Sequence, residues 1–206
     1  MVVYRLHYFE GLGGRVEAVR IILAYGNIPY EQVDIPDHEW PKLKANYPNN
    51  QLPVLEEDGK MLTQSMAIAR YFAKKLDLLG KTPWEEAQAD AFIGTIEDAI
   101  ATLKSTNLIQ NLILGHGNEQ TASEAADALR PFLERLEKHL LTTNGQNLVG
   151  NHLTWADLAI ADLYKRFCIT IPHLLDGFPE VKKFTNHVYN LPGVKEYVAK
   201  RHIKNF

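Results

Sequence analysis

The sequence changes character near residue 80, and this change limits the folds that the chain can adopt. Before residue 80, short runs rich in β-branched and aromatic residues alternate with helical patterns, and after it the strand patterns fade. Alternating strands and helices favour an α/β sheet domain, whereas successive helices pack on one another. We therefore expect a small α/β domain over residues 1–79, a linker over 80–83 and an all-helical domain over 84–206.

Within the first part, the pattern predicts strands over residues 3–9, 30–35, 52–56 and 60–62 and helices over 15–25 and 65–76. The dipeptide Asp58-Gly59 lies between the last two strands and predicts a tight hairpin turn. The stretch between the second and third strands shows no clear pattern. The expected order is therefore β-α-β, an irregular stretch, and β-β-α.

In the second part, helices are expected over 84–114, 121–141 and 154–171, with two short helices between 179 and 200. Thr154 and Asp157 stand three residues apart at the start of an apolar run, which is the spacing of a capping box. We interpret this pair as a folding signal rather than a functional one.

Composition excludes several classes of function. The 206 residues carry 22 Lys and Arg against 25 Asp and Glu, a formal net charge of -3, which argues against a chain built to coat nucleic acid. The one cysteine, Cys168, allows neither an internal disulfide nor a cysteine-based zinc site, and the eight histidines show no metal-ligand spacing. No signal peptide or membrane span is expected, so the expected location is the cytoplasm.

Pro53 interrupts an otherwise strand-like run, Gln51-Leu52-Pro53-Val54-Leu55. Proline cannot donate a ladder hydrogen bond, so it marks an edge strand, a bulge or a cis bond. Alternatively, Leu52 presents free backbone groups to an extended, peptide-like ligand.

Two further positions allow both a structural and a functional interpretation. Tyr8 is expected near the end of the first strand, beside a glycine-rich turn, either as a packed tyrosine or as a hydroxyl held close to a reactive group. Ser65 is expected to cap a helix that begins at Met66. The functional interpretation of Gln64-Ser65 is that the free backbone N–H groups at this helix start bind a carboxylate.

Trp40 and Lys44 share one face if their short segment is helical. Lys44 is then either an ordinary solvated lysine beside a packed tryptophan or a cation that neutralises a second carboxylate. The glycines at 11, 13 and 14 do not form a dinucleotide fingerprint, because Val16 stands where the last glycine is required.

Taken together, these features resemble the cytosolic glutathione transferases over essentially the whole chain. The likeness is greatest to the sigma class, with its nematode-type members and the haematopoietic prostaglandin D synthases. It rests on the order and spacing of short matching stretches: Tyr4-Arg5-Leu6-His7-Tyr8-Phe9, Arg15-Val16-Glu17, Glu39-Trp40-Pro41, Gln51-Leu52-Pro53-Val54-Leu55, Asp58-Gly59-Lys60, Gln64-Ser65-Met66-Ala67-Ile68-Ala69-Arg70-Tyr71 and Leu153-Thr154-Trp155-Ala156-Asp157.

The resemblance implies a thioredoxin-like domain, an all-helical domain and a homodimer with one site per subunit. By position, Tyr8 matches the family's catalytic tyrosine. Arg15 matches an arginine that lies below the hydroxyl of that tyrosine in the family. The resemblance further implies a glutathione site that comprises Tyr8, Trp40, Lys44, Asn50, Gln51, Leu52, Pro53, Gln64, Ser65 and Asp98, with Asp98 reaching across the dimer.

The implied chemistry is thiolate stabilisation. A free thiol with a pKa of ~8.5 is only slightly ionised at neutral pH, so a hydroxyl donating to sulfur and a nearby cation would favour the reactive thiolate. The expected activity is transfer of glutathione to hydrophobic electrophiles, with a peroxidase side activity. The alternatives are a glutathione-dependent prostaglandin D isomerase, and a non-catalytic carrier of haem or other hydrophobic ligands.

The sequence departs from the family pattern in two places. Asn49-Asn50-Gln51 replaces the usual Phe-Gly followed by Lys or Gln, and the turn after Tyr8 is one residue longer than in the prostaglandin synthases. We expect an altered loop at 49–51 and an altered mouth of the electrophile pocket.

Overall fold

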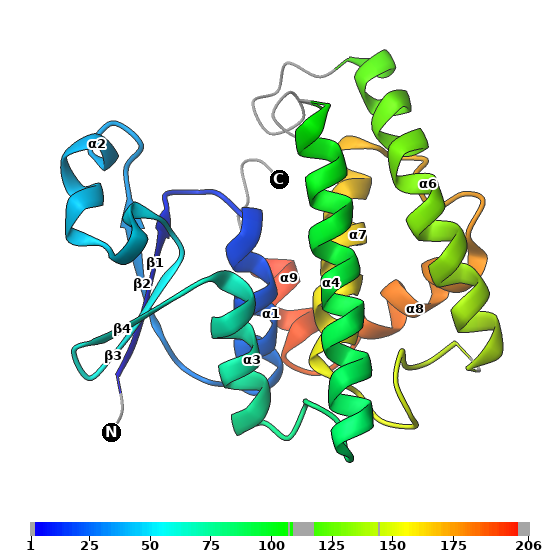
Figure 1. The fold of residues 1–206 in the computed structure, drawn as a ribbon, viewed down its shortest axis with the longest axis horizontal. Coiled ribbons are helices and arrows are strands. Elements are labelled where there is room, and N and C mark those ends of the chain that lie inside the picture. The colour runs from blue at the N-terminus through cyan, green and yellow to red at the C-terminus, as the bar shows by residue number, and fades with distance from the viewer. Residues whose placement is uncertain (1–2, 107, 109–117, 144, 202–206) are drawn as a thin grey trace.

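The computed structural model describes residues 3–106, 108, 118–143 and 145–201, and it places a four-stranded sheet beside a group of helices (Figure 1). The sheet has the order β2-β1-β3-β4. Its strands are β1 (Tyr4–Phe9), β2 (Glu31–Ile35), β3 (Val54–Glu57) and β4 (Lys60–Thr63). Strands β1 and β2 are parallel, and the other two pairings are antiparallel.

Two helices connect and cover this sheet. Helix α1 (Glu17–Tyr25) links the parallel strands, and the predicted apolar positions Val16, Val19, Ile22 and Leu23 are all fully buried. Helix α1 packs against α3 (Ser65–Lys75), and Figure 1 shows both helices between the sheet and the helical part. We call the boundary between the sheet part and the helical part the seam. A cavity at this seam can therefore be lined by side chains from both parts of the chain.

The irregular stretch and the predicted hairpin both have defined conformations. Residues 36–51 contain the short helix α2 (Trp40–Leu43) and the 3-10 turns η2 (Lys44–Asn46) and η3 (Pro48–Asn50), and a third such turn, η1 (Gly14–Val16), precedes α1. At the hairpin, Asp58 and Gly59 have positive φ values of 49° and 77°, as the tightest hairpin turns require. The hairpin prediction is confirmed.

The helical part follows residues 76–82. Its helices are α4 (Pro83–Ser105), α6 (Glu119–Thr142), α7 (Trp155–Thr170), α8 (Pro179–Tyr189) and α9 (Val194–Lys200). The expected end of the first of these helices at residue 114 lies outside the described residues. Helix α7 is buried on most sides, as its apolar sequence predicts. Among the described helices, none is long and apolar enough to cross a membrane. The domain limits at 79 and 84 stay a prediction.

The predicted capping box at the start of α7 is confirmed. Asp157 Oδ2 accepts hydrogen bonds from the Thr154 N–H at 2.6 Å and the Thr154 hydroxyl at 2.7 Å, and Oδ1 accepts from the Leu148 N–H at 2.7 Å. Burial raises the pKa of Asp157 to about 6, although these three bonds act in the opposite direction. The backbone N–H of the adjacent Trp155 donates to the Leu78 carbonyl at 2.9 Å, which connects this helix start to the segment after α3.

A buried ionic cluster joins α1 to α7 and to the end of α9. We define it as Glu17, Arg20, Asp162, Arg166 and Arg201. The Arg201 Nη1 atom lies 2.8 Å from Glu17 Oε2 and also 2.8 Å from Asp162 Oδ1, so a single guanidinium bridges both carboxylates. Glu17 also contacts Arg20 Nη1 at 2.7 Å and the Tyr197 hydroxyl at 3.0 Å, and Arg166 Nε donates to Asp162 Oδ2 at 2.7 Å.

Both carboxylates of this cluster are fully buried. Burial alone would raise the pKa of Asp162, but Arg166 and Arg201 hold it below its ordinary range. Removing one partner of a buried ion pair typically costs about 3–5 kcal/mol, because the other charge stays buried. The cluster therefore fixes how the sheet part and the helical part are packed on each other.

Two details differ from the sequence-based expectation. The N-cap of α3 is Gln64, with a positive φ of 71°, and the helix begins at Ser65, so the expected cap at Ser65 is wrong by one position. Pro53 is preceded by a cis peptide bond and lies just before β3. Because β3 runs between β1 and β4, the edge-strand interpretation of Pro53 is also wrong.

We expect Asp157→Asn to lower the free energy of unfolding by about 1–3 kcal/mol. An amide offers one oxygen where the carboxylate offers two, so at least one buried N–H loses its acceptor. Urea denaturation followed by circular dichroism measures this. Asp127→Asn is the control, because Asp127 is an exposed residue of α6 whose ion pair with Arg130 is also exposed. Equal stability of the two variants would contradict the assigned role of Asp157.

Candidate functional site

Two adjoining cavities open at the seam between the sheet part and the helical part. The first is polar, has a volume of about 510 Å³ and is lined by Phe9, Arg15, Trp40, Asn50, Gln51, Leu52, Pro53, Thr63, Gln64, Ser65 and Lys104. The second is mainly apolar, has a volume of about 210 Å³ and is lined by Tyr8, Gly14, Arg15, Ala18, Met66, Ile96, Ile100, Lys104, Ala159, Leu163 and Arg166. Arg15 and Lys104 line both, so the two cavities meet at these residues.

Tyr8 lies on β1, and its ring is almost completely buried, with 7% of the residue exposed. Its hydroxyl oxygen accepts a hydrogen bond from the Arg15 N–H at 3.2 Å, at the start of the helical segment that continues into α1. Burial raises the pKa of Tyr8 above its ordinary value, and the Arg15 N–H and the charges of Arg166, Arg20 and Arg15 oppose this shift without cancelling it. The hydroxyl is therefore protonated at neutral pH and can donate a hydrogen bond.

Gly14 allows the Tyr8 hydroxyl to take this position. Gly14 has a positive φ of 48°, and a Cβ added there would lie 2.4 Å from the Tyr8 oxygen. Such a distance is far below van der Waals contact, and left-handed backbone also disfavours a side chain. In the sequence, Gly14 is recognisable only as part of a glycine-rich turn, and no local pattern indicates this role.

Arg15 has two separate contacts at the site. Its backbone N–H donates a hydrogen bond to the Tyr8 hydroxyl oxygen. Its guanidinium pairs with Glu97 of α4, and Nη1 lies 2.8 Å from Oε2 and 3.1 Å from Oε1. This ion pair crosses the seam and partly compensates the charge of Arg15. The catalytic role of Arg15 stays a prediction, and no local pattern in the sequence pointed to Glu97 as its partner.

Seven residues predicted to bind glutathione line the polar cavity, and one of them is Trp40. The other six come from two segments that meet at one end of the sheet: Asn50, Gln51, Leu52 and Pro53 before β3, and Gln64 and Ser65 at the start of α3. Ser65 is only 5% exposed. The first N–H groups of an α-helix have no partners within the helix, so this end of the cavity suits an anionic group. Asn49 and Asn50 both have positive φ, a conformation that asparagine tolerates well.

Trp40 and Lys44 lie one helical turn apart, as expected, because the Lys44 backbone N–H donates to the Trp40 carbonyl, but they differ in their relation to the cavities. Trp40 lines the polar cavity, and its ring packs edge-on against Phe9 at a centroid distance of 5.4 Å. Lys44 lies at the end of α2, is exposed and is absent from the residues that line either cavity. The lysine that does line both cavities is Lys104, which comes from the far end of α4. No local sequence pattern connects Lys104 with Tyr8, because about a hundred residues separate them.

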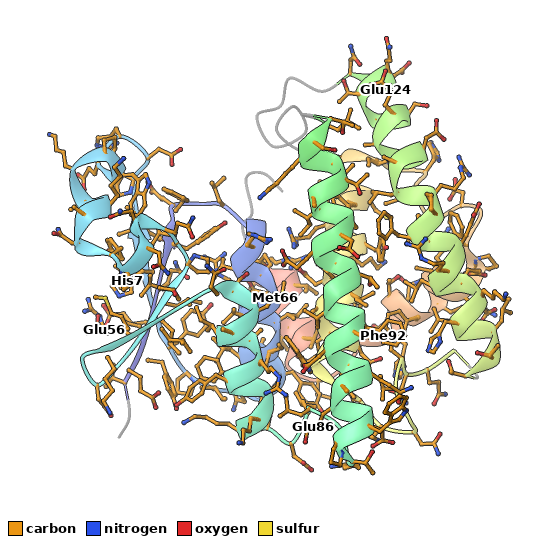
Figure 2. The ribbon with its side chains drawn as sticks, in the orientation of Figure 1. His7, Glu56, Met66, Glu86, Phe92 and Glu124 are labelled. Carbon is orange, nitrogen blue, oxygen red and sulfur yellow. The ribbon has the colours of Figure 1, made fainter. Side chains whose placement is uncertain are left out.

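Asp98 is exposed on α4 and lines neither cavity of its own chain. Its predicted contact across a dimer therefore stays a prediction. Met66, by contrast, follows the predicted Gln64-Ser65 pair and lines the apolar cavity; Figure 2 shows it at the start of α3, beside α4.

A third cavity, of about 260 Å³, lies between α4, α6 and α7. None of the predicted site residues lines it, so it is not the candidate site. Within the described part of the chain, no group of three or more His, Cys, Asp or Glu residues could hold a metal ion.

Comparison with known proteins identifies the family. The model of the glutathione S-transferase N-terminal domain matches residues 4–74, and that of the C-terminal domain matches residues 107–201. The chain belongs to the glutathione S-transferase family. This confirms the resemblance, the predicted fold class and the transferase assignment, and glutathione is the substrate that this family uses.

Full-length relatives support the same conclusion. Glutathione S-transferase 1 of Ascaris suum is 36% identical over 204 residues, with 98% of each chain covered. Hematopoietic prostaglandin D synthase of Mus musculus is 36% identical over 200 residues, with 96% of each chain covered. The solved structure of monomeric Na-GST-3, a glutathione S-transferase of Necator americanus, superposes with a TM-score of 0.88 at 36% identity, covering 98% of this chain and 99% of that one.

We expect Gly14→Ala to reduce kcat for glutathione conjugation about tenfold or more, while the affinity for glutathione changes little. The added methyl group must displace the Tyr8 hydroxyl, whereas the residues around the polar cavity keep their places. Gly59→Ala is the matched control, because Gly59 also has a positive φ but has open space around its Cβ position. If both variants lose equal stability and neither loses activity, Gly14 does not position Tyr8.

Proposed function

We propose that this transferase binds glutathione in the polar cavity and stabilises its thiolate with the Tyr8 hydroxyl, for attack on a hydrophobic electrophile in the apolar cavity. The observation that carries this proposal is the position of Tyr8, a buried phenol that lines the apolar cavity directly beside the polar one. A reactive sulfur atom has to lie at such a junction to reach a second substrate.

The lining of the polar cavity supports the placement of glutathione. Glutathione is an extended tripeptide with two carboxylates, so it needs backbone partners along its length and positive potential at its ends. The backbone at Leu52 is available just before β3, and the start of α3 at Gln64 and Ser65 favours a carboxylate. Trp40 and Lys104 lie on the same cavity, and Lys104 replaces Lys44 as the lysine that could neutralise the other carboxylate.

The hydrogen bond from Tyr8 is strong enough to account for most of the required decrease in the thiol pKa. Lowering a thiol pKa by about two units takes about 2.7 kcal/mol. A hydrogen bond to a charged acceptor contributes about 1.5–3 kcal/mol, so the Tyr8 hydroxyl can supply most of this. Because burial keeps the pKa of Tyr8 raised, the phenol acts as a donor to sulfur and not as the base that removes its proton.

A prostaglandin D isomerase is the second candidate, and the similarity to the murine hematopoietic prostaglandin D synthase favours it. The same thiolate could open an endoperoxide or reduce a hydroperoxide. Product analysis with prostaglandin H2 separates the isomerase from a general transferase. Carriage of haem or other hydrophobic ligands is compatible with both enzymes, because it needs only the apolar surface.

A homodimer, a sigma-like class, a cytoplasmic location and a role in detoxification also belong to this proposal. Family membership and the nematode relative support them. The Necator americanus relative is described as monomeric, so the dimer needs its own test. In the proposed dimer, the exposed Asp98 of one subunit reaches the γ-glutamyl amine that is bound by the other.

We expect Tyr8→Phe to fold normally, to bind glutathione and to lose most of the thiolate, with kcat for chlorodinitrobenzene falling about 10- to 100-fold. Ultraviolet difference spectra of bound glutathione report the thiolate directly. Tyr71→Phe is the control, because the Tyr71 hydroxyl donates to Glu57 and lines neither cavity. An unchanged thiolate signal in Tyr8→Phe would remove Tyr8 from the mechanism.

We expect Asp98→Ala to weaken glutathione binding about tenfold by calorimetry, without a change in the fold. Asp127→Ala, which removes another exposed carboxylate of the helical part, should bind glutathione as the unmodified protein does. Sedimentation of the same samples gives the oligomeric state. Wild-type affinity in the Asp98 variant, or a monomer that binds fully, would contradict the contact across the dimer.

A further inference from the structure

We propose that His7 is a positioning residue for glutathione: through Tyr47 it holds residues 40–51 against the sheet, in the conformation that binds this substrate. The inference rests on the function proposed above, in which glutathione lies in the polar cavity. Residues 40–51 form one wall of that cavity and have little packing of their own. None of the residues of α2, η2 and η3, all of which the structure describes, is buried. Such short helices are not stable by themselves.

His7 and Tyr8 are neighbours on β1 and therefore point to opposite faces of the sheet. Tyr8 lies on the face of α1, where its hydroxyl accepts from the Arg15 N–H. His7 and Phe9 lie on the other face, and Figure 1 shows α2 on that side of the sheet, away from α1 and α3. The residue that follows His7 thus belongs to the proposed reaction centre, whereas His7 itself faces the wall that α2 begins.

His7 is only 5% exposed, and both of its ring nitrogens have partners. Nε2 lies 3.2 Å from Glu56 Oε2 on β3 (Figure 2), and Nδ1 lies 3.2 Å from the Tyr47 hydroxyl. Burial holds the pKa of His7 below its ordinary value, although Glu56 opposes this shift, so the ring is neutral at neutral pH. Because a carboxylate only accepts, Nε2 carries the hydrogen, and Nδ1 accepts from Tyr47.

Tyr47 connects this hydrogen bond to two parts of the cavity wall. Its ring packs against Trp40 at a centroid distance of 5.6 Å, and Trp40 lines the polar cavity. Its backbone carbonyl accepts from the Asn50 N–H at 3.0 Å, and both Asn50 and Gln51 line the cavity. His7 and Tyr47 do not line it. His7 can therefore act on bound glutathione only through the position of its neighbours.

The two ends of the wall are held by different contacts. Trp40 packs edge-on against Phe9 at one end. At the other end, Asn49 donates to Thr63 Oγ1 at 3.4 Å, but this bond is long and exposed, so the buried His7 contributes the stronger hydrogen bond through Tyr47. A wall that already has its bound conformation costs less free energy on binding than one that the ligand has to order.

Two substitutions of His7 separate its two hydrogen bonds. The side-chain oxygen of Asn takes about the position of Nδ1, so His7→Asn keeps an acceptor for Tyr47 and gives up the contact with Glu56. The side-chain nitrogen of Gln takes about the position of Nε2, so His7→Gln keeps a donor for Glu56 and gives up the acceptor for Tyr47. Both variants bury an amide at the same position, so each controls for the loss of stability in the other.

We expect His7→Gln to raise the Kd of glutathione about fivefold by calorimetry, as loss of one ordinary hydrogen bond would, and His7→Asn to change it by less than about twofold. In His7→Gln, KM for glutathione should rise with Kd, while kcat for chlorodinitrobenzene at saturating glutathione stays the same, because binding is affected and the thiolate is not.

Tyr47→Phe should reproduce the effect of His7→Gln, and the double variant should lose no more affinity than either single variant, since both remove the same bond. Tyr71→Phe is the control for loss of a tyrosine hydroxyl, because Tyr71 donates to Glu57 and lines neither cavity. Because Tyr47 is half-buried, its variant decides the question if His7→Gln does not fold.

Equal glutathione affinity in the two His7 variants overturns the proposal, and so does an unchanged Kd in Tyr47→Phe. A fall in kcat as large as the rise in KM also overturns it, because His7 would then act on the reaction centre or on the whole fold. In each of these cases the unmodified protein still binds glutathione and forms its thiolate. If the unmodified protein does neither, the function proposed above has itself failed.

Discussion

The shared guanidinium of Arg201 is the contact on which the rest of the structure depends. It bridges the buried carboxylates of Glu17 and Asp162, and so connects the first helix of the sheet part with the central helix of the helical part. Buried charges tolerate little displacement, because an ion that loses its partner pays the full penalty of desolvation. The two parts are therefore held in one arrangement, and both cavities form along the boundary between them.

The chemistry at that boundary follows from burial. Tyr8 is packed tightly enough to stay protonated, and its oxygen is close enough to Gly14 that no larger residue fits there. The helix start at Arg15 supplies the N–H that orients the hydroxyl. In the proposed mechanism, the single Tyr8 phenol contacts a thiol that is bound in the polar cavity and faces an electrophile that is bound in the apolar cavity.

Most of the fold could be predicted, and the reason lies in local patterns. Asp58-Gly59 predicts its hairpin because only certain residues accept the required positive φ values, and Thr154 and Asp157 predict a helix start because their spacing satisfies the free N–H groups. The errors also have local causes. Ser65 is an intrinsically better cap than Gln64, yet the turn after β4 places Gln64 at the cap, and Pro53 marks a cis bond rather than an edge.

By itself, the sequence determined the change from an α/β part to a helical part, the family and seven of the predicted glutathione-binding residues that line the polar cavity. These features depend on the spacing of residues along the chain. That spacing determines which local hydrogen bonds form and which side chains share a face. Only the tertiary structure decided that Lys104 lines the cavities where Lys44 does not, that Glu97 holds Arg15, and that Arg166 lines the same cavity as Tyr8. Those relations join residues that are tens of positions apart, and packing across the boundary between the two parts, not any local preference, sets the distances between them.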